Sequence, residues 1–236
     1  MTTEEESVDG GEGGKADFAV LHRGKTMYKH CFKRIFDFLF ALTALVVLSV
    51  PLLVVILLVV LMQGRPVFFV QRRIGRGNKP FSMLKFCSMT NARDAEGKLL
   101  PDAERLTAIG KFLRKSSIDE LPALINVLKG EMSLIGPRPL PVVYYPYFTD
   151  EELHRHDVRG GLTGLAQING RNRLTWEEKF KYDLEYVSGL SFWMDCRIFF
   201  MSIRKVLCGA DVSVRQDDGS GDLDAQRKPY RDGKLR

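Results

Sequence analysis

The sequence has few cysteines, no cysteine or histidine motif typical of a zinc site and no internal repeat. Its 236 residues include four cysteines, and none of them form a Cys-x-x-Cys pair. They are Cys31, Cys87, Cys196 and Cys208. We therefore predict reduced thiols on the cytosolic side of a membrane, not a disulfide framework. His154 and His156 have no plausible ligand set around them, so zinc is not expected and both are predicted to be solvated surface side chains.

Acidic residues are scarce in the body of the chain. Residues 1–14 contain five acids and no base, and residues 211–236 contain six of each. Residues 15–210 contain 29 Lys and Arg but only 18 Asp and Glu, a formal charge of about +11. Such a basic body suits anionic lipid headgroups, phosphates or nucleic acid.

Both ends of the chain are poor in apolar residues. Residues 1–26 are rich in Glu and Gly and are predicted to be a disordered extension. They lack the basic start and apolar block of a signal peptide. Residues 215–236 are predicted to be a flexible tail. The apolar content of 45% permits one ordinary domain between these ends.

The sequence has only one long apolar run, which argues against a multi-span membrane protein. The run Phe38–Met62 has no charged residue and is long enough for a membrane helix. Basic residues on both sides favour a cytoplasmic location for both of its ends, which a straight crossing cannot satisfy. Pro51 removes a backbone hydrogen bond, and Ser49 can satisfy a freed backbone group. We therefore predict a re-entrant helix-break-helix over residues 27–63, with a kinked full span as the alternative.

Residues 64–214 are predicted to form a compact cytoplasmic α/β domain that is mostly α-helical. Two extended pieces, Pro66–Gln71 and Lys79–Phe86, flank a turn and predict a small β-hairpin. Residues 90–105 are predicted to be a loop. The aromatic residues within 140–148 fit either a membrane interface or ordinary core packing. Four further helices are expected at Leu106–Leu113, Asp150–His156, Trp176–Val187 and Phe192–Leu207.

Two adjacent carboxylates, Asp119 and Glu120, stand at the head of a predicted helix that ends at Gly130. Ser117 with Glu120 fits a capping box. Asp119 as the N-cap instead keeps Pro122 inside the first turn, and we prefer it. In either case the positive end of the helix dipole favours the ionised carboxylates. The plain interpretation is that both are only helix caps.

Cations surround the pair in the sequence. Arg114 precedes it, and Arg138 lies in the stiff turn Gly136–Pro139. Lys85 ends a predicted strand, either near a phosphate or simply at the surface. The Gly-rich segment Arg159–Asn172 adds amides and cations in a predicted loop. Carboxylates among fixed cations are typical of phosphate chemistry with a divalent metal.

These segments together resemble the small monotopic phosphoglycosyl transferases, also called bacterial sugar transferases, over about residues 27–214. Within that family the sequence is most similar to the single-domain enzymes that initiate bacterial N-linked glycan assembly. The resemblance rests on Lys85-Phe86, Leu113-Arg114, Ser117–Pro122, Asn126–Gly130, Met132–Pro139 and Gly161–Asn172.

The resemblance implies a reaction on the cytoplasmic face of the bacterial inner membrane. A UDP-sugar, expected to carry an N-acetylated amino sugar, donates sugar-1-phosphate to polyprenyl (undecaprenyl) phosphate, and UMP leaves. Asp119 is implied as the nucleophile, through an aspartyl-phosphosugar intermediate. Glu120 is implied as the Mg²⁺ ligand and as a group that helps to deprotonate the acceptor. The implied substrate- and phosphate-binding residues are Lys85, Arg114, Arg138, Gln167 and Arg171.

The sequence departs from the family pattern in three places, none within the carboxylate pair. Val50 separates Ser49 from Pro51, Cys87 follows Lys85-Phe86 where a base is common, and Gly160 stands where Pro is common. The alternative from another class is a membrane-tethered basic protein that binds anionic lipid or nucleic acid without catalysis. Carboxylates among the cations would weaken polyanion binding, so no nucleic-acid partner is expected. The oligomeric state is left open.

Overall fold

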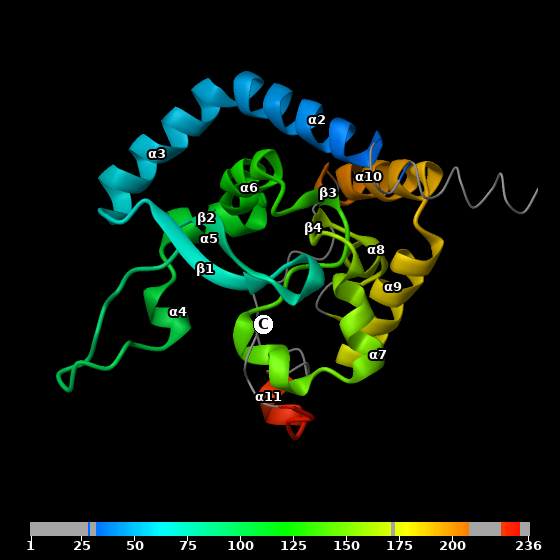
Figure 1. Ribbon diagram of the computed structural model, residues 1–236. Helices are drawn as coiled ribbons and strands as arrows, with labels where there is room; N and C mark the ends of the chain where they lie inside the picture. Colours follow the sequence, from blue (N-terminus) through cyan, green and yellow to red (C-terminus); the bar gives the residue numbers. More distant parts are fainter. Residues whose placement is uncertain (1–27, 29–31, 171–172, 208–222, 232–236) are drawn as a thin grey trace, which may run out of the picture.

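The computed structural model of the protein describes residues 28, 32–170, 173–207 and 223–231. Two long helices, α2 (Lys33–Val47) and α3 (Ser49–Gln63), form an arch over one side of a mostly helical domain with two small sheets (Figure 1). The predicted fold class, mostly α-helical with a small β-hairpin, is confirmed.

The remaining elements follow in chain order. They are β1 (Phe68–Ile74), η2 (Arg76–Asn78), β2 (Pro80–Phe86), α4 (Asp102–Arg105), α5 (Ala108–Lys115), η3 (Ile118–Ala123), α6 (Leu124–Lys129), β3 (Ser133–Ile135), η4 (Val142–Tyr147), α7 (Asp150–Leu153), η5 (His154–Asp157), β4 (Gly161–Thr163), α8 (Leu165–Asn169), α9 (Trp176–Gly189), α10 (Phe192–Leu207) and α11 (Leu223–Gln226).

The predicted break in the apolar run is present. The axes of α2 and α3 differ by 63°, and Leu48 separates the two helices. The Ser49 hydroxyl donates to the Val46 carbonyl at 2.7 Å, and Pro51 lies in the first turn of α3, where a missing N–H costs least. Each helix has 15 residues, a length of roughly 22 Å. Within the described residues no single helix is long and apolar enough to cross a bilayer, whereas this bent pair together meets that test.

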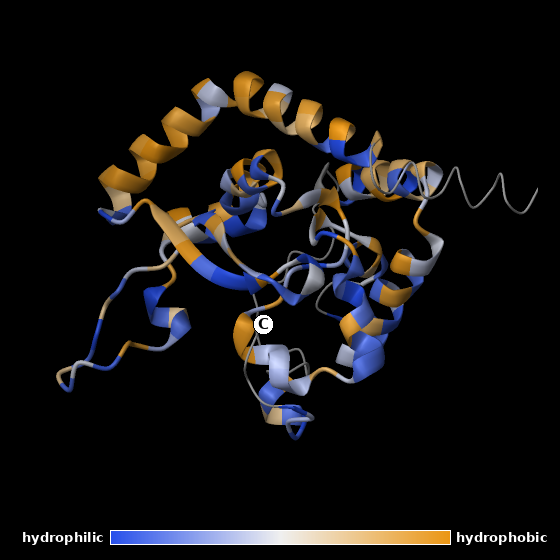
Figure 2. Ribbon diagram, viewed as in Figure 1, coloured by the Kyte–Doolittle hydropathy of each residue, from blue (hydrophilic) through white to orange (hydrophobic). Residues whose placement is uncertain are grey.

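The arch is apolar along most of its length (Figure 2). Many of its large apolar side chains face outward, among them Leu39, Val47 and Leu61. The start of α2 is polar and is tied to the domain. Arg34 donates to the Val127 and Leu128 carbonyls at 2.5 and 2.7 Å. Both carbonyls lie in the last turn of α6. The Val127 carbonyl also accepts from the Gly130 N–H at 3.0 Å, so Arg34 adds to the capping of this helix end.

The predicted hairpin forms from β1 and β2, which pair antiparallel from Phe68–Phe86 to Ile74–Pro80. A second sheet was not predicted: β3 and β4 pair in parallel. The Gly-rich segment is therefore not a loop, because it supplies β4 and α8. A Cβ on Gly161 would lie 2.2 Å from the Gly136 nitrogen, so close backbone contact already explains that glycine.

Three further local predictions are decided by burial. Tyr144 and Phe148 belong to a hydrophobic core, so the aromatic residues within 140–148 include core residues. His156 is 4% exposed, and its Nδ1 lies 2.7 Å from the Asn78 side-chain oxygen. The prediction of a surface side chain is wrong for His156, because the turn of the hairpin covers it, whereas His154 is exposed.

The predicted flexible tail does not hold for its described part, residues 223–231. Leu223 is fully buried in the same core as Phe148. The Tyr230 N–H donates to the Pro146 carbonyl at 2.7 Å. The prediction was based on low apolar content, but a single buried leucine and several polar contacts are enough to hold a short segment against an existing core.

Candidate active site

The predicted helix around the acidic pair is built from two elements. Residues Ile118–Ala123 form a 3₁₀ turn that contains Pro122, and α6 follows directly. Ser117 has a left-handed backbone (φ 58°) and makes no side-chain cap. Asp119 is thus not the N-cap, and no capping box forms. The Pro122 ring clashes with the carbonyl four residues earlier in a regular α-helix, which disfavours a continuous α-helix through this turn. Gly130 ends α6 with φ 84°, as predicted.

Asn126 holds strand β2 against this segment. It is 2% exposed. Its side-chain oxygen accepts from the Leu84 N–H at 3.0 Å, and its amide nitrogen donates to the Ser82 carbonyl at 2.7 Å. Both backbone groups lie on the edge of β2 that does not pair with β1. The side chain therefore closes that edge and brings the neighbouring Lys85 to the acidic pair.

Glu120 is the centre of a buried ion cluster. Lys85 Nζ donates to its Oε1 at 2.7 Å, and the Arg138 guanidinium donates to both carboxylate oxygens, at 3.2 Å to Oε2. The Glu120 side chain is only 19% exposed. Burial alone would raise its pKa, but the charges and hydrogen bonds of Arg138 and Lys85 outweigh burial and hold the pKa well below its usual range. Glu120 is therefore ionised at neutral pH.

Asp119 differs from its neighbour. Burial and the charge of Glu120 raise the pKa of Asp119, against the opposing effect of Lys85 and other cations nearby. The helix-dipole argument predicted the other direction. It fails because the turn is short and desolvation acts directly on the carboxyl group. Within the described residues the Asp119 carboxylate has no hydrogen bond or ion pair, so its oxygens are available to a substrate.

The other predicted site residues have three different outcomes. Arg114 lies close enough to Asp119 to lower its pKa, but its guanidinium bonds the Ser88 hydroxyl at 2.9 Å. The Gln167 amide has both polar atoms buried without a hydrogen-bond partner. No contact joins it to the acidic pair among the described residues. Arg171 lies outside the described residues.

Sequence reasoning missed Asn126 and Arg155. Asn126 is a polar residue within an otherwise apolar stretch of α6, which was an available signal. Arg155 is 2% exposed and donates to the Arg138 carbonyl at 2.8 Å, although it stands in a polar segment that predicts a surface helix. No local pattern distinguishes such a buried arginine from an exposed one.

The donor set of the site fits Mg²⁺. Mg²⁺ prefers oxygen ligands and is commonly held by one or two carboxylates together with substrate phosphates. Asp119 and Glu120 offer two adjacent carboxylates. Oε1 of Glu120 accepts from both Lys85 and Arg138, whereas Oε2 accepts only from Arg138 and has a second lone pair left for a metal. No group of three or more His, Cys, Asp or Glu that would form an all-protein metal cage occurs in the described part of the chain. These residues therefore fit a Mg²⁺ ion that would be coordinated jointly by the protein carboxylates and the substrate phosphates.

Comparison with known proteins decides the family. The family model described as "Bacterial sugar transferase" matches residues 28–209. The chain belongs to the bacterial sugar transferase family. The acidic pair, Lys85 and Arg138 all lie inside the matched region of this sugar transferase, whereas the C-terminal residues 210–236 lie beyond it.

Relatives of this sugar transferase include a somewhat shorter protein, which the match covers almost completely, and several much longer ones. The uncharacterized sugar transferase EpsL of Bacillus subtilis is 48% identical over 197 residues, 81% of this chain and 98% of the relative. The UDP-glucose:undecaprenyl-phosphate glucose-1-phosphate transferase of Klebsiella pneumoniae is 40% identical over 74% of this chain and 40% of its own. The UDP-N-acetylgalactosamine-undecaprenyl-phosphate N-acetylgalactosaminephosphotransferase of Aeromonas hydrophila is 38% identical over 75% of this chain and 44% of its own. This chain thus spans less than half of the length of the Klebsiella pneumoniae and Aeromonas hydrophila relatives.

Proposed function

We propose that this sugar transferase moves sugar-1-phosphate from a UDP-sugar to undecaprenyl phosphate and releases UMP. The observation that carries the proposal is the unpaired Asp119 carboxylate beside Glu120, which Lys85 and Arg138 hold ionised. The relatives named for such transfers to undecaprenyl phosphate support it. Family membership also favours a transferase over a non-catalytic basic protein.

The first half of the reaction uses Asp119 as the nucleophile. A carboxylate oxygen of Asp119 attacks the phosphorus that carries the sugar and forms a new P–O bond. The bond from that phosphorus to the oxygen bridging the two phosphates breaks, and UMP leaves with the electron pair. The product is an aspartyl-phosphosugar. Arg138 and Lys85 lie beside the carboxylates, where they offset the repulsion between an anionic nucleophile and an anionic diphosphate.

The second half regenerates the enzyme. A phosphate oxygen of undecaprenyl phosphate attacks the same phosphorus and breaks its bond to Asp119. The carboxylate is freed, and undecaprenyl-diphosphate sugar forms. The resemblance also implies that Glu120 helps to deprotonate the acceptor, but its low pKa makes it a weak base, so its main part in this proposal is to hold the cations and the metal. Mg²⁺ held by Glu120 and the substrate phosphates would supply further charge neutralisation.

The apolar arch supports a position at the cytoplasmic membrane. Its outward-facing apolar residues and its 63° bend fit insertion into one leaflet with both ends on the cytoplasmic face. A lipid-linked phosphate acceptor then reaches the acidic pair without leaving the bilayer. This orientation is part of the proposal.

The identity of the sugar stays a prediction. The names of the relatives include glucose, N-acetylgalactosamine and galactose transfers, so similarity of this degree does not select one donor. We propose an N-acetylated amino sugar. A panel of UDP-sugars, assayed by UMP release with undecaprenyl phosphate present, identifies the donor.

The decisive experiment replaces Asp119. Asp119→Asn is expected to abolish transfer while membrane association is retained, because the amide is isosteric but cannot form the acyl phosphate. Asp102→Asn is a matched control, since the Asp102 side chain is 81% exposed.

The covalent intermediate is tested separately. Wild-type protein incubated with UDP-sugar labelled at the phosphorus that bears the sugar, and with no acceptor, should retain label on the chain, and Asp119→Asn should not. Substantial transfer by purified Asp119→Asn would refute the nucleophile assignment.

A further inference from the structure

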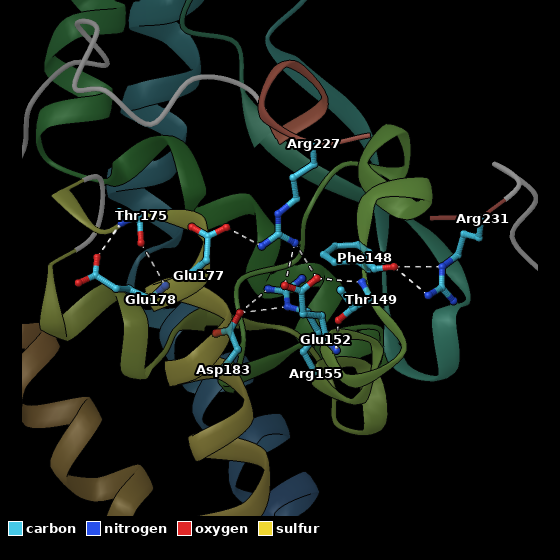
Figure 3. A network of polar contacts seen from close by, with 10 residues as sticks. All are labelled: Phe148, Thr149, Glu152, Arg155, Thr175, Glu177, Glu178, Asp183, Arg227 and Arg231. Carbon is cyan, nitrogen blue, oxygen red and sulfur yellow. Dashed lines mark hydrogen bonds and ion pairs between the residues drawn. The ribbon is translucent and has the colours of Figure 1, made fainter. Parts of the chain in front are cut away.

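The C-terminal segment, Leu223–Arg231, lies beyond the region matched by the family model and yet packs on the catalytic domain. Figure 3 shows Arg227 and Arg231 reaching from this segment to residues before and within α7 and at the start of α9. Leu223 is fully buried in a core that also contains Leu140, two residues after Arg138. The segment therefore completes the core that adjoins the Arg138 turn.

Arg227 makes the main polar attachment of this segment. Its guanidinium donates to both oxygens of Glu152 at 2.8 Å and to Glu177 at 2.7 Å. It also lies over the Phe180 ring, 5.3 Å from the ring centroid. Its side chain and that of Glu152 are only 14% and 12% exposed. Nη1 makes both bonds to Glu152 and Nη2 makes the bond to Glu177, so the guanidinium is held between two carboxylates.

Arg231 attaches the end of the segment. Its guanidinium donates twice to the Phe148 carbonyl, at 3.1 and 2.8 Å, and once to Asp150 at 2.9 Å. The segment thus contacts two aromatic residues, Phe180 through Arg227 and Phe148 through Arg231.

The same two aromatic rings enclose Arg155. Its guanidinium carbon lies 5.5 Å from the Phe148 centroid and 5.6 Å from the Phe180 centroid. Asp183 accepts two bonds from it, at 3.0 and 2.6 Å, in a pair that is almost fully buried. Nη2 of Arg155 also donates to the Arg138 carbonyl at 2.8 Å. Arg155 therefore connects the aromatic pair to the backbone of Arg138.

The backbone of Arg138 is held by this contact, and its side chain is held by Glu120. Its side chain is 42% exposed, so packing does not immobilise the guanidinium. Its bonds to both Glu120 oxygens orient the guanidinium, and the turn Gly136–Pro139 sets the position of its backbone. Arg73 supports the turn from the other side by donating to the Pro139 carbonyl at 3.0 Å.

We infer that the C-terminal segment is a positioning element for Arg138. Arg227 clamps Phe180 and the start of α9, the aromatic pair holds Arg155, and Arg155 fixes the Arg138 carbonyl. This inference rests on the proposed function, in which Arg138 binds the phosphates of the UDP-sugar. Arg227 and Arg155 are positioning residues, because neither touches the acidic pair.

The test compares two variants of the full-length protein. Arg227→Gln removes the clamp, and Lys228→Gln removes the same charge from the adjacent exposed side chain. The first measurement is hydrogen–deuterium exchange in the peptide that covers residues 136–148. We expect faster exchange in Arg227→Gln and wild-type exchange in Lys228→Gln. Unchanged exchange in Arg227→Gln overturns the inference, whatever the activity of the protein.

The second measurement is UMP release at saturating undecaprenyl phosphate, below the unfolding temperature of both variants. We expect kcat/KM for the UDP-sugar to fall roughly tenfold in Arg227→Gln, as for other residues that orient a binding group. The KM for undecaprenyl phosphate should stay unchanged, and Arg227→Lys should recover part of the loss. A fall in kcat alone, with both KM values unchanged, indicates only loss of folded protein and overturns the inference. If the wild type shows no UMP release, the proposed function is overturned. Hydrogen–deuterium exchange over residues 136–148 then still tests whether the C-terminal segment positions Arg138.

Discussion

The replacement Asn126→Ala measures how the fold delivers Lys85 to the acidic pair. It removes the partners of the Leu84 N–H and the Ser82 carbonyl at a site that is 2% exposed. An unsatisfied buried backbone group costs about 1–3 kcal/mol. Two such groups give about 2–6 kcal/mol, and we expect about 3 kcal/mol because water reaches part of the opened edge. For a chain of this size that loss lowers Tm by about 6–12 °C.

The assay is thermal unfolding of the purified protein, followed by transfer activity at a temperature where all variants are folded. Asn169→Ala is the matched control, because Asn169 is exposed and its amide makes one local bond, to the Leu165 carbonyl at 2.8 Å. We expect little change in the control and reduced transfer in Asn126→Ala, since Lys85 follows Leu84 directly. A Tm change below about 2 °C would show that Asn126 does not close this edge, which refutes the reasoning.

Three further predictions concern the reaction and its setting. Transfer should fall on the acid side at a higher pH than an ordinary aspartate gives, because Asp119 must be ionised to attack and its pKa is raised. Transfer should also fall on the alkaline side, at a pH below the usual lysine range, because burial lowers the pKa of Lys85 and only charged Lys85 holds Glu120. A plot of kcat/KM against pH whose two limbs lie at the ordinary aspartate and lysine pKa values contradicts this prediction. Excess chelator should abolish transfer and added Mg²⁺ restore it, whereas full activity in chelator excludes the metal. Tags at positions 20 and 220 should both be cytoplasmic, and one tag on the far side would establish a full span.

Local patterns predicted the elements that depend mainly on neighbours in sequence. The break near Pro51, the hairpin and the helix Phe192–Leu207 were each predicted and are present. Each follows from a short-range cause: a missing N–H, a turn between extended pieces, or apolar residues at helical spacing. The second sheet was missed because β3 and β4 are three-residue strands that pair only across the domain.

In the candidate site, too, the features that depend on nearby sequence were predicted and those that depend on distant contacts were not. The acidic pair was found because two carboxylates stand amid basic residues within a few turns of chain. The pairing of Glu120 with Lys85 joins positions 35 residues apart, and the direction of the Asp119 pKa depends on burial. Arg155 and the docked Arg227 look like surface charges until their partners are placed.

The sequence by itself determined the family motifs, the apolar arch with its break, and the residues at which phosphate chemistry is proposed. Only the tertiary structure decided which carboxylate is held by cations, which one is left open, and how the C-terminal segment reaches the Arg138 turn. The physical reason is the range of the forces. Backbone propensities act over a few residues, whereas desolvation and ion pairing depend on groups that meet only when the chain is folded.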